Sequence, residues 1–288
     1  MQTTVKWLSL AIHQLPCMKG LGRRVITAVV FVVIMLAGLF TGPYTFSFLF
    51  LAITAACLWE FYSLTLDLRT KRDVFRKIAG VILGCLPFIL TTIVKVIGVK
   101  EPSTFIQISS LLFSPLVFTI FIYELFSKSK EPFVNISFLV LGLFYIGLPF
   151  ALLNFIAFDG DTFLHRIVFG LLVLTWVNDA GAYLVGSMMG KTPLLPRVSP
   201  NKTWEGSLGG ILTSIGFGVL LGYVFDEIAA RHWIILALIV AVFGSLGDLV
   251  ESLLKRSVGA KDSGNILPGH GGVLDRFDAF IFAIPFAG

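Results

Sequence analysis

Residues 25–41 read Val-Ile-Thr-Ala-Val-Val-Phe-Val-Val-Ile-Met-Leu-Ala-Gly-Leu-Phe-Thr, a run without a charged side chain. An α-helix needs about 20 mainly apolar residues to cross the hydrocarbon core of a bilayer. This run is close to that length, and others like it follow along the chain. Because only helices and closed barrels satisfy their backbone hydrogen bonds in lipid, the repeated runs predict an all-α, polytopic integral membrane protein.

Nine apolar runs are candidate membrane spans. The last has only 16 residues and includes charged side chains, so we expect either that the chain is cut short after Gly288 or that its final helix is incomplete. The nine runs are 25–41, 46–64, 78–94, 105–126, 135–157, 167–189, 207–225, 233–254 and 273–288.

The bulk composition supports this fold class. Hydrophobic residues make up 56% of the 288 residues and charged residues 14%, with a mean hydropathy of +0.91. Soluble domains carry about 25% charged residues, and disordered chains, collagens, coiled coils and small disulfide scaffolds have other compositions. The net charge of +5 is spread over short loops. This spread argues against nucleic acid and favours anionic lipid headgroups and phosphate-bearing substrates as partners.

The loops between the runs differ in charge from one side of the membrane to the other. With the N-terminus in the cytoplasm, the cytoplasmic segments hold 17 of the 22 Lys and Arg residues, whereas the opposite loops hold four. Cytoplasmic loops of membrane proteins are enriched in Lys and Arg. We therefore expect a protein of the cytoplasmic membrane whose N-terminus lies inside and whose C-terminus lies outside. The cytoplasmic segments are the N-terminal tail, 65–77, 127–134, 190–206 and 255–272.

Ionisable residues are concentrated in the last four spans. The first five contain few beyond Glu60 and Glu124, which lie near cytoplasmic helix ends. A charged side chain at the centre of a membrane helix costs about 2.5–3.5 kcal/mol on insertion scales, so an intramembrane carboxylate usually marks function. We expect a cytoplasmic tail at 1–24, a five-helix scaffold at 25–157 and a four-helix catalytic region at 158–288.

The loop 190–206 is the first candidate site. Its three prolines exclude a continuous helix. Its last part, 199–203, leads directly into the seventh span, and the backbone amides at a helix N-terminus favour anions. A phosphate cradle and a capped, positively charged connector are both compatible with this sequence. The candidate phosphate-binding residues are Ser199, Asn201, Lys202 and Thr203.

A second polar cluster joins the last two spans. Asp248, Glu251 and Ser252 are spaced i, i+3 and i+4, which places them on one face of the eighth span. Asp275 and Asp278, at i and i+3, share a face of the ninth span. Since one span runs inward and the next outward, both acidic faces can meet near the cytoplasmic loop between them. That loop is rich in glycine and carries Lys255, Arg256, Lys261 and His270.

Carboxylates from two helices surrounded by Lys and Arg are what a site for Mg²⁺ and a polyphosphate requires. Mg²⁺ prefers oxygen ligands and leaves coordination positions for substrate phosphates. Buried structural ion pairs are the alternative, although such pairs rarely gather in this number beside a His-Gly-Gly turn. Asp179 is a further candidate carboxylate that can equally serve as a polar contact between helices. His270 is either a phosphate donor or a residue that shapes its turn.

Three segments of this polar region carry a family resemblance. Ser252-Leu-Leu-Lys-Arg-Ser-Val-Gly-Ala-Lys-Asp-Ser-Gly-Asn-Ile-Leu-Pro-Gly-His-Gly-Gly-Val-Leu-Asp-Arg-Phe-Asp278 resembles the signature of the phosphatidate cytidylyltransferases, also called CDP-diacylglycerol synthases. Ser199-Pro-Asn-Lys-Thr-Trp-Glu-Gly206 and Asn178-Asp-Ala-Gly-Ala-Tyr183 are similar to two other recurrent segments of that family. The resemblance covers about 175–278, and the first five spans match in hydropathy alone. Family members usually carry a longer final helix.

The resemblance implies that CTP and phosphatidate give CDP-diacylglycerol and pyrophosphate, with Mg²⁺ as the cofactor. It implies that Asp248 and Asp275 hold a metal pair, that Asp278 supports them, and that K⁺ is a candidate second cation. It also implies a homodimer, with membrane lipids as further partners and an active site that faces the cytoplasm.

This reaction suits the residues. A phosphatidate oxygen is already anionic at neutral pH, so the chemistry needs relief of charge repulsion more than it needs a strong base. We expect Asp248, Asp275, Lys255 and Arg276 to be catalytic, with Arg276 on the lipid phosphate. The expected phosphate clamps are Lys202, Lys255, Arg256 and Lys261.

Three other functions remain open at this point. A lipid-alcohol kinase would also use carboxylates, Mg²⁺ and basic loops, but it would transfer a γ-phosphoryl group. A transporter or channel would place its charges along a path through the bundle, and no inverted repeat of broken helices is visible. A cytidylyltransferase for another lipid phosphate, such as an archaeal ether lipid, is the nearest alternative.

Overall fold

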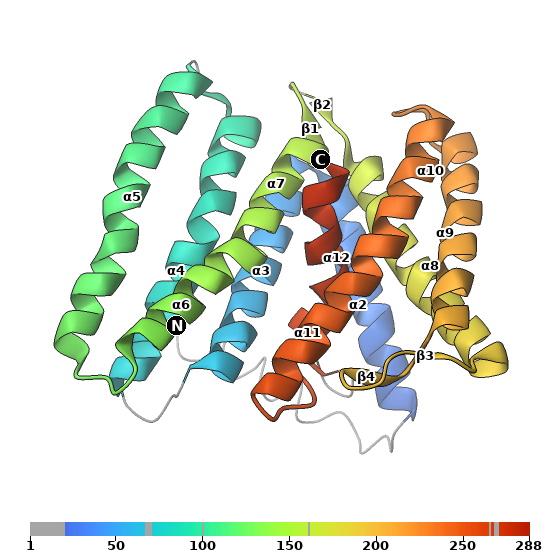
Figure 1. Cartoon of the computed structure of the whole chain (residues 1–288). Coiled ribbons are helices and arrows are strands. Elements are labelled where there is room, and N and C mark those ends of the chain that lie inside the picture. The colour runs from blue at the N-terminus through green and yellow to red at the C-terminus, as the bar shows by residue number, and fades with distance from the viewer. Residues whose placement is uncertain (1–20, 67–70, 100, 161, 265, 268–270) are drawn as a thin grey trace.

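The structure is a computed structural model that describes residues 21–66, 71–99, 101–160, 162–264, 266–267 and 271–288. Within these residues the chain forms a bundle of helical segments, each coinciding with one of the predicted apolar runs (Figure 1). The segments are α2 (Leu21–Thr41), α3 (Pro43–Thr65), α4 (Lys71–Thr92) with η1 (Ile93–Gly98), α5 (Pro102–Ser127), α6 (Pro132–Gly142) with η2 (Leu143–Gly147) and α7 (Leu148–Ala157), α8 (His165–Met189), α9 (Trp204–Val224), α10 (Ala230–Ile239) with η3 (Val240–Gly244) and α11 (Ser245–Ser257), and α12 (Leu274–Ala287).

The all-α polytopic fold is confirmed. Among the described residues, seven helices are long and apolar enough to cross a membrane. The two other segments are shorter: the apolar part of α2 is Val25–Thr41, and α12 has 14 residues. The nine predicted spans are therefore all helical, but two of them fall below the length of a full span.

Local sequence accounts for several helix boundaries and continuities. Pro43 and Pro132 stand in the first turns of α3 and α6, where a missing amide hydrogen costs nothing. The π-helical turns η2 and η3 join shorter α-helices into single long segments, so Ala230–Ser257 is continuous over 28 residues. A π-turn inserts one residue into a helix and often occurs beside a functional site. Here η3 directly precedes the helix that carries Asp248.

Two short antiparallel hairpins lie at opposite ends of the bundle. β1 (Phe158–Asp159) pairs with β2 (Thr162–Phe163), and β3 (Pro193–Leu195) pairs with β4 (Ser199–Thr203). Figure 1 shows the β3–β4 hairpin beside the end of α11, whereas β1–β2 lies at the end where the chain terminates. The prediction that 190–206 is not a continuous helix is confirmed. The structure shows in addition that β3 and β4 pair as a hairpin and that α9 begins at Trp204.

Aromatic side chains from three helices converge on α12. The ring centroid of Phe280 lies 6.3 Å from that of Phe50 in α3. Phe277 lies 6.2 Å from Phe150 in α7 and 6.0 Å from Phe31 in α2. The rings of Phe277 and Phe280 are both buried. Such close packing fixes rotamers and backbone position, so the short α12 is held in the interior and its first turn has a defined place.

Candidate active site

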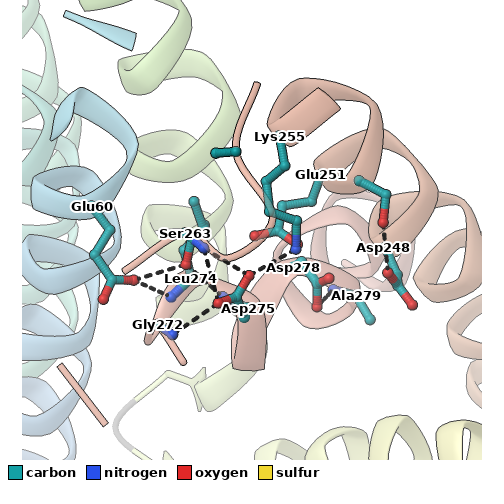
Figure 2. Close-up of polar contacts among 12 residues, drawn as sticks. Glu60, Asp248, Glu251, Lys255, Ser263, Gly272, Leu274, Asp275, Asp278 and Ala279 are labelled. Carbon is teal, nitrogen blue, oxygen red and sulfur yellow. Dashed lines mark hydrogen bonds and ion pairs between the residues drawn. The ribbon is translucent and has the colours of Figure 1, made fainter. Parts of the chain in front are cut away.

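The acidic faces of α11 and α12 meet at the end of the bundle that carries β3–β4 (Figures 1 and 2). Single carboxylate oxygens of Asp248, Glu251 and Asp278 all lie within 4.8 Å of one another. Glu251 and Asp278 are buried, and the Asp248 side chain is 33% exposed. The three carboxylates therefore form a largely buried acidic group that is open to the surface at Asp248.

A glycine allows the two helices to approach at this point. A Cβ atom at Gly247 would lie 2.5 Å from Cβ of Phe282 and 2.8 Å from the carbonyl oxygen of Asp278. Only a residue without a side chain fits that space. Gly247 thus brings the backbone of α11 against that of α12, next to Asp248.

Lys255 compensates the buried charge. Its ammonium lies 2.6 Å from Oε2 of Glu251, one helical turn earlier, and 2.7 Å from Oδ1 of Asp275. Carboxylates that share a buried site repel one another unless a cation lies between them. Lys255 therefore joins the acidic face of α11 to the first turn of α12.

Asp275 binds the backbone of the loop before α12 in addition to Lys255. Its carboxylate accepts hydrogen bonds from the backbone amide of Gly272 at 2.8 Å and from that of Ser263 at 3.1 Å and 3.2 Å, as well as from Lys255 (Figure 2). It is not one of the three residues whose oxygens come within 4.8 Å. Asp275 thus ties the loop before α12 to Lys255, while Asp278 faces α11.

The β3–β4 hairpin brings a base to the acids. Lys202 of β4 forms an ion pair with Asp248. Thr203 ends the hairpin and caps α9, since its Oγ1 accepts from the amide of Gly206 at 3.1 Å. Glu205 accepts from the amides of Lys191 and Thr192, each at 3.1 Å, which closes the base of the hairpin.

The other two residues predicted from this loop lie along β4. Ser199 begins the strand opposite Leu195, and Asn201 is exposed. Of the four predicted residues, Lys202 is the one that the structure pairs with the acidic group.

A pocket of about 230 Å³ opens beside the acids between α2, α8 and α12. The pocket lining combines ionisable side chains with apolar ones. The polar lining residues are Asp179, Asp275, Arg276 and Asp278, and the others include Thr27, Ala28, Phe31, Val32, Trp176 and Leu267.

The remaining predicted site residues lie at the end of α11, in the loop after it, or in the lining of this pocket. Arg256, in the last turn of α11, is exposed and donates to the carbonyl oxygen of Ala260 at 3.2 Å, and Lys261 is exposed in the loop that follows. Asp179 and Arg276 are exposed residues of the pocket lining. His270 lies outside the described residues.

Glu60 is a residue of this region that sequence reasoning did not include among its candidates. It comes from α3, in the part of the chain expected to be scaffold, and its carboxylate contacts the loop before α12. The available signal was its position: a carboxylate in an otherwise apolar run is costly unless it has partners.

Comparison with known proteins identifies the family of this chain. A sequence model of the cytidylyltransferase family matches residues 22–288. A phosphatidate cytidylyltransferase of Staphylococcus aureus strain COL is 43% identical over 182 residues, which cover 62% of this chain and 67% of that protein. The phosphatidate cytidylyltransferase of Staphylococcus epidermidis strain ATCC 35984 is 41% identical over 182 residues, with the same coverage. Since the family match extends over nearly the whole sequence, this chain belongs to the cytidylyltransferase family.

Proposed function

We propose that this chain transfers the cytidylyl group of CTP to phosphatidate, giving CDP-diacylglycerol and pyrophosphate. The observation that carries the proposal is the group of Asp248, Glu251 and Asp278, flanked by Lys202 and Lys255, in a member of this family. Paired acids and bases at one end of a bundle of apolar helices suit a charged nucleotide and a lipid phosphate. The choice of CTP and phosphatidate as substrates rests on the relatives, which are phosphatidate cytidylyltransferases.

The acidic group fits a divalent cation that prefers oxygen ligands. Three carboxylates offer one oxygen each, and Oε1 of the buried Glu251 has no hydrogen-bond partner. A buried carboxylate oxygen without a partner is costly unless something positive binds it. We assign this place to Mg²⁺, held by Asp248, Glu251 and Asp278, with Asp275 held beside it by Lys255. A bound Mg²⁺ supplies charge neutralisation to the nucleotide phosphates.

The chemistry needs little proton transfer. An anionic oxygen of the phosphatidate phosphate attacks the α-phosphorus of CTP, and a new P–O bond forms. The bond from the α-phosphorus to the oxygen that bridges to the β-phosphorus breaks, and its electron pair leaves with pyrophosphate. No general base is required, because the attacking oxygen carries its charge already. The chain must instead align two anions and stabilise the leaving group.

The basic residues have three roles: one contacts the nucleotide, one contacts the lipid phosphate, and one holds the acids. Lys202 lies at the open side of the acidic group, where it meets the triphosphate, and Lys255 holds Glu251 and Asp275 in place. Arg276 lines the pocket beside the acids, where it meets the lipid phosphate. The helix α2, which also lines this pocket, has many exposed apolar side chains, so the acyl chains can stay in the bilayer. Arg256 and Lys261, both exposed, add positive charge at the end of α11 and in the loop that follows.

The cellular setting follows from the charge bias. Because cytoplasmic loops are enriched in Lys and Arg, we propose that the β3–β4 end of the bundle faces the cytoplasm, where CTP is found, and that the protein lies in the cytoplasmic membrane. A homodimer and K⁺ as a second cation are proposals that rest on the family resemblance.

Position-specific labels test this function. Purified protein is incubated with phosphatidate, Mg²⁺ and CTP labelled with ³²P at either the α or the γ position. Cytidylyl transfer puts the α-label into chloroform-soluble lipid and the γ-label into pyrophosphate. Transfer of the γ-label to a lipid alcohol would identify a kinase instead. Activity with an archaeal ether-lipid phosphate but not with phosphatidate would move the chain to the nearest alternative.

A further inference from the structure

Glu60 is a buried carboxylate without a role in the proposed mechanism. The residue is 2% exposed and lies in α3. Its Oε2 accepts a hydrogen bond from the amide of Leu274 at 2.8 Å (Figure 2). Leu274 is the first residue of α12, and such an amide has no acceptor within its own helix. Glu60 therefore caps α12 from a helix that lies 214 residues earlier in the chain.

Ser263 connects Glu60 to the acidic group. Its Oγ lies 3.2 Å from Oε2 of Glu60, and its amide donates to Asp275 at 3.1 Å. The amide of Asp275 donates back to Oγ of Ser263 at 3.3 Å. Asp275 in turn holds Lys255, which also binds Glu251. A continuous chain of polar contacts thus runs from α3 to the buried acid of α11.

Two glycines of the loop give the Glu60 carboxylate its room. A Cβ atom at Gly264 would lie 2.4 Å from Oε1, 2.7 Å from Cδ and 2.9 Å from Cγ of Glu60. A Cβ atom at Gly272 would lie 2.5 Å from Oε2 of Glu60 and 2.0 Å from Oγ of Ser263. Gly264 and Gly272 therefore both lie against the Glu60 carboxylate. The three atoms nearest to a Cβ at position 264 all belong to Glu60, so Glu60 accounts for the glycine there.

We propose that Glu60 is a positioning residue for cytidylyl transfer. It fixes Ser263 and the first turn of α12, and through them it sets where Asp275, Lys255 and Asp278 lie. A carboxylate suits this place, because negative charge is stabilised at a helix N-terminus and accepts two donors at once. This inference rests on the proposed function, which supplies the reaction being positioned.

The first test is Glu60→Gln, which keeps the size of the side chain and removes its charge. We expect kcat to fall about tenfold to a hundredfold, as is typical when a residue supporting metal ligands is changed. The Mg²⁺ concentration for half-maximal rate should rise, while KM for phosphatidate stays the same. An unchanged kcat and an unchanged Mg²⁺ response in Glu60→Gln would overturn the proposal.

Glu124→Gln is the matched control. Glu124 is also a buried carboxylate, 3% exposed, but it pairs with Arg76 between α5 and α4. Its replacement should lower the melting temperature and leave kcat and the Mg²⁺ response of the folded protein unchanged. Equal kinetic losses in both variants would mean that Glu60 acts through stability alone, which would also overturn the proposal.

A second test does not depend on turnover. We measure the rise in melting temperature that Mg²⁺ causes in the wild type, Gly264→Ala, Glu60→Ala and the double variant. Gly264→Ala should reduce the rise in the wild-type background and have no further effect once Glu60 is removed, because the clash is with Glu60. Gly216→Ala is the control, since a Cβ atom there meets nothing within 4 Å.

The two tests separate the inference from the proposed function. Additive effects of Gly264→Ala and Glu60→Ala would contradict the role of Glu60, whatever reaction the protein catalyses. A wild type that transfers no label from CTP would contradict the function, and the Mg²⁺ melting cycle would still decide the role of Glu60.

Discussion

Lys202 of β4 is ion-paired with Asp248 of α11, so a base from the hairpin rests on the open side of the acidic group. The two side chains are 28% and 33% exposed. In the proposed site, an ammonium in this place lies where the metal ion or the substrate phosphate would bind, so it has to move or share its partner when they do. The pair also joins the segment 199–206, which resembles a family motif, to α11, the helix that leads into the signature-like segment 252–278.

Replacing Lys202 with Met should separate these roles. We expect kcat/KM for CTP to fall about 10²–10³-fold, the range seen when a donor to transition-state charge is removed. Without nucleotide, Mg²⁺ should stabilise Lys202→Met at a lower concentration than the wild type, because the competing ammonium is gone. Steady-state kinetics and melting curves over a Mg²⁺ series measure both effects.

The control for Lys202 is Lys191→Met, an exposed lysine before the same hairpin. Isolated surface charges contribute little, so its kcat/KM should stay within about twofold of wild type. A similar loss in both variants would show that total charge at this end, and not Lys202 itself, matters.

Glu251→Gln should abolish the activation of the reaction by Mg²⁺. Glu251 is buried and has one oxygen bound to Lys255 and the other without a partner. We expect a rate loss of about a hundredfold or more, equivalent to ~2.7 kcal/mol in the barrier, and loss of Mg²⁺-induced stabilisation. Asp226→Asn, an exposed acid between α9 and α10, is the control. Normal Mg²⁺ activation of Glu251→Gln would remove this residue from the proposed metal site.

Cysteine labelling can test the orientation in the membrane. Cys57 and Cys85 are buried, so single cysteines can be introduced after Cys17→Ser. An impermeant maleimide should react with Arg197→Cys only in inverted vesicles and with Asp159→Cys only in right-side-out vesicles. The reverse pattern would place the acidic site outside and would be incompatible with a supply of cytoplasmic CTP.

Hydropathy was sufficient to predict the helices, because membrane spans are set by run length and backbone hydrogen bonding. It could not predict the β3–β4 hairpin, whose strands are short and include Pro193 and Pro200. The i, i+3 spacing correctly put Asp248 and Glu251 on one face. It could not show that Lys255 reaches Asp275, leaving Asp278 to approach the acids of α11.

Glu60 marks the limit of sequence reasoning for this site. Its contacts with Ser263 and Leu274 cross 203 and 214 residues of sequence. Local spacing holds no information on such contacts, because they depend on how α3 packs against the loop before α12. Only the cost of burying a carboxylate indicated that it has partners.

The most direct test of the central claim is transfer of α-³²P from CTP to chloroform-soluble lipid by the wild type and by Asp275→Asn in the same assay. The account predicts phosphatidate-dependent label with release of pyrophosphate by the wild type. It predicts at least a hundredfold less label with the variant, or about 2.7 kcal/mol, because Lys255 and the loop amides lose their charged acceptor. Full activity of Asp275→Asn would contradict the proposed site, and no phosphatidate-dependent label from the wild type would contradict the proposed function.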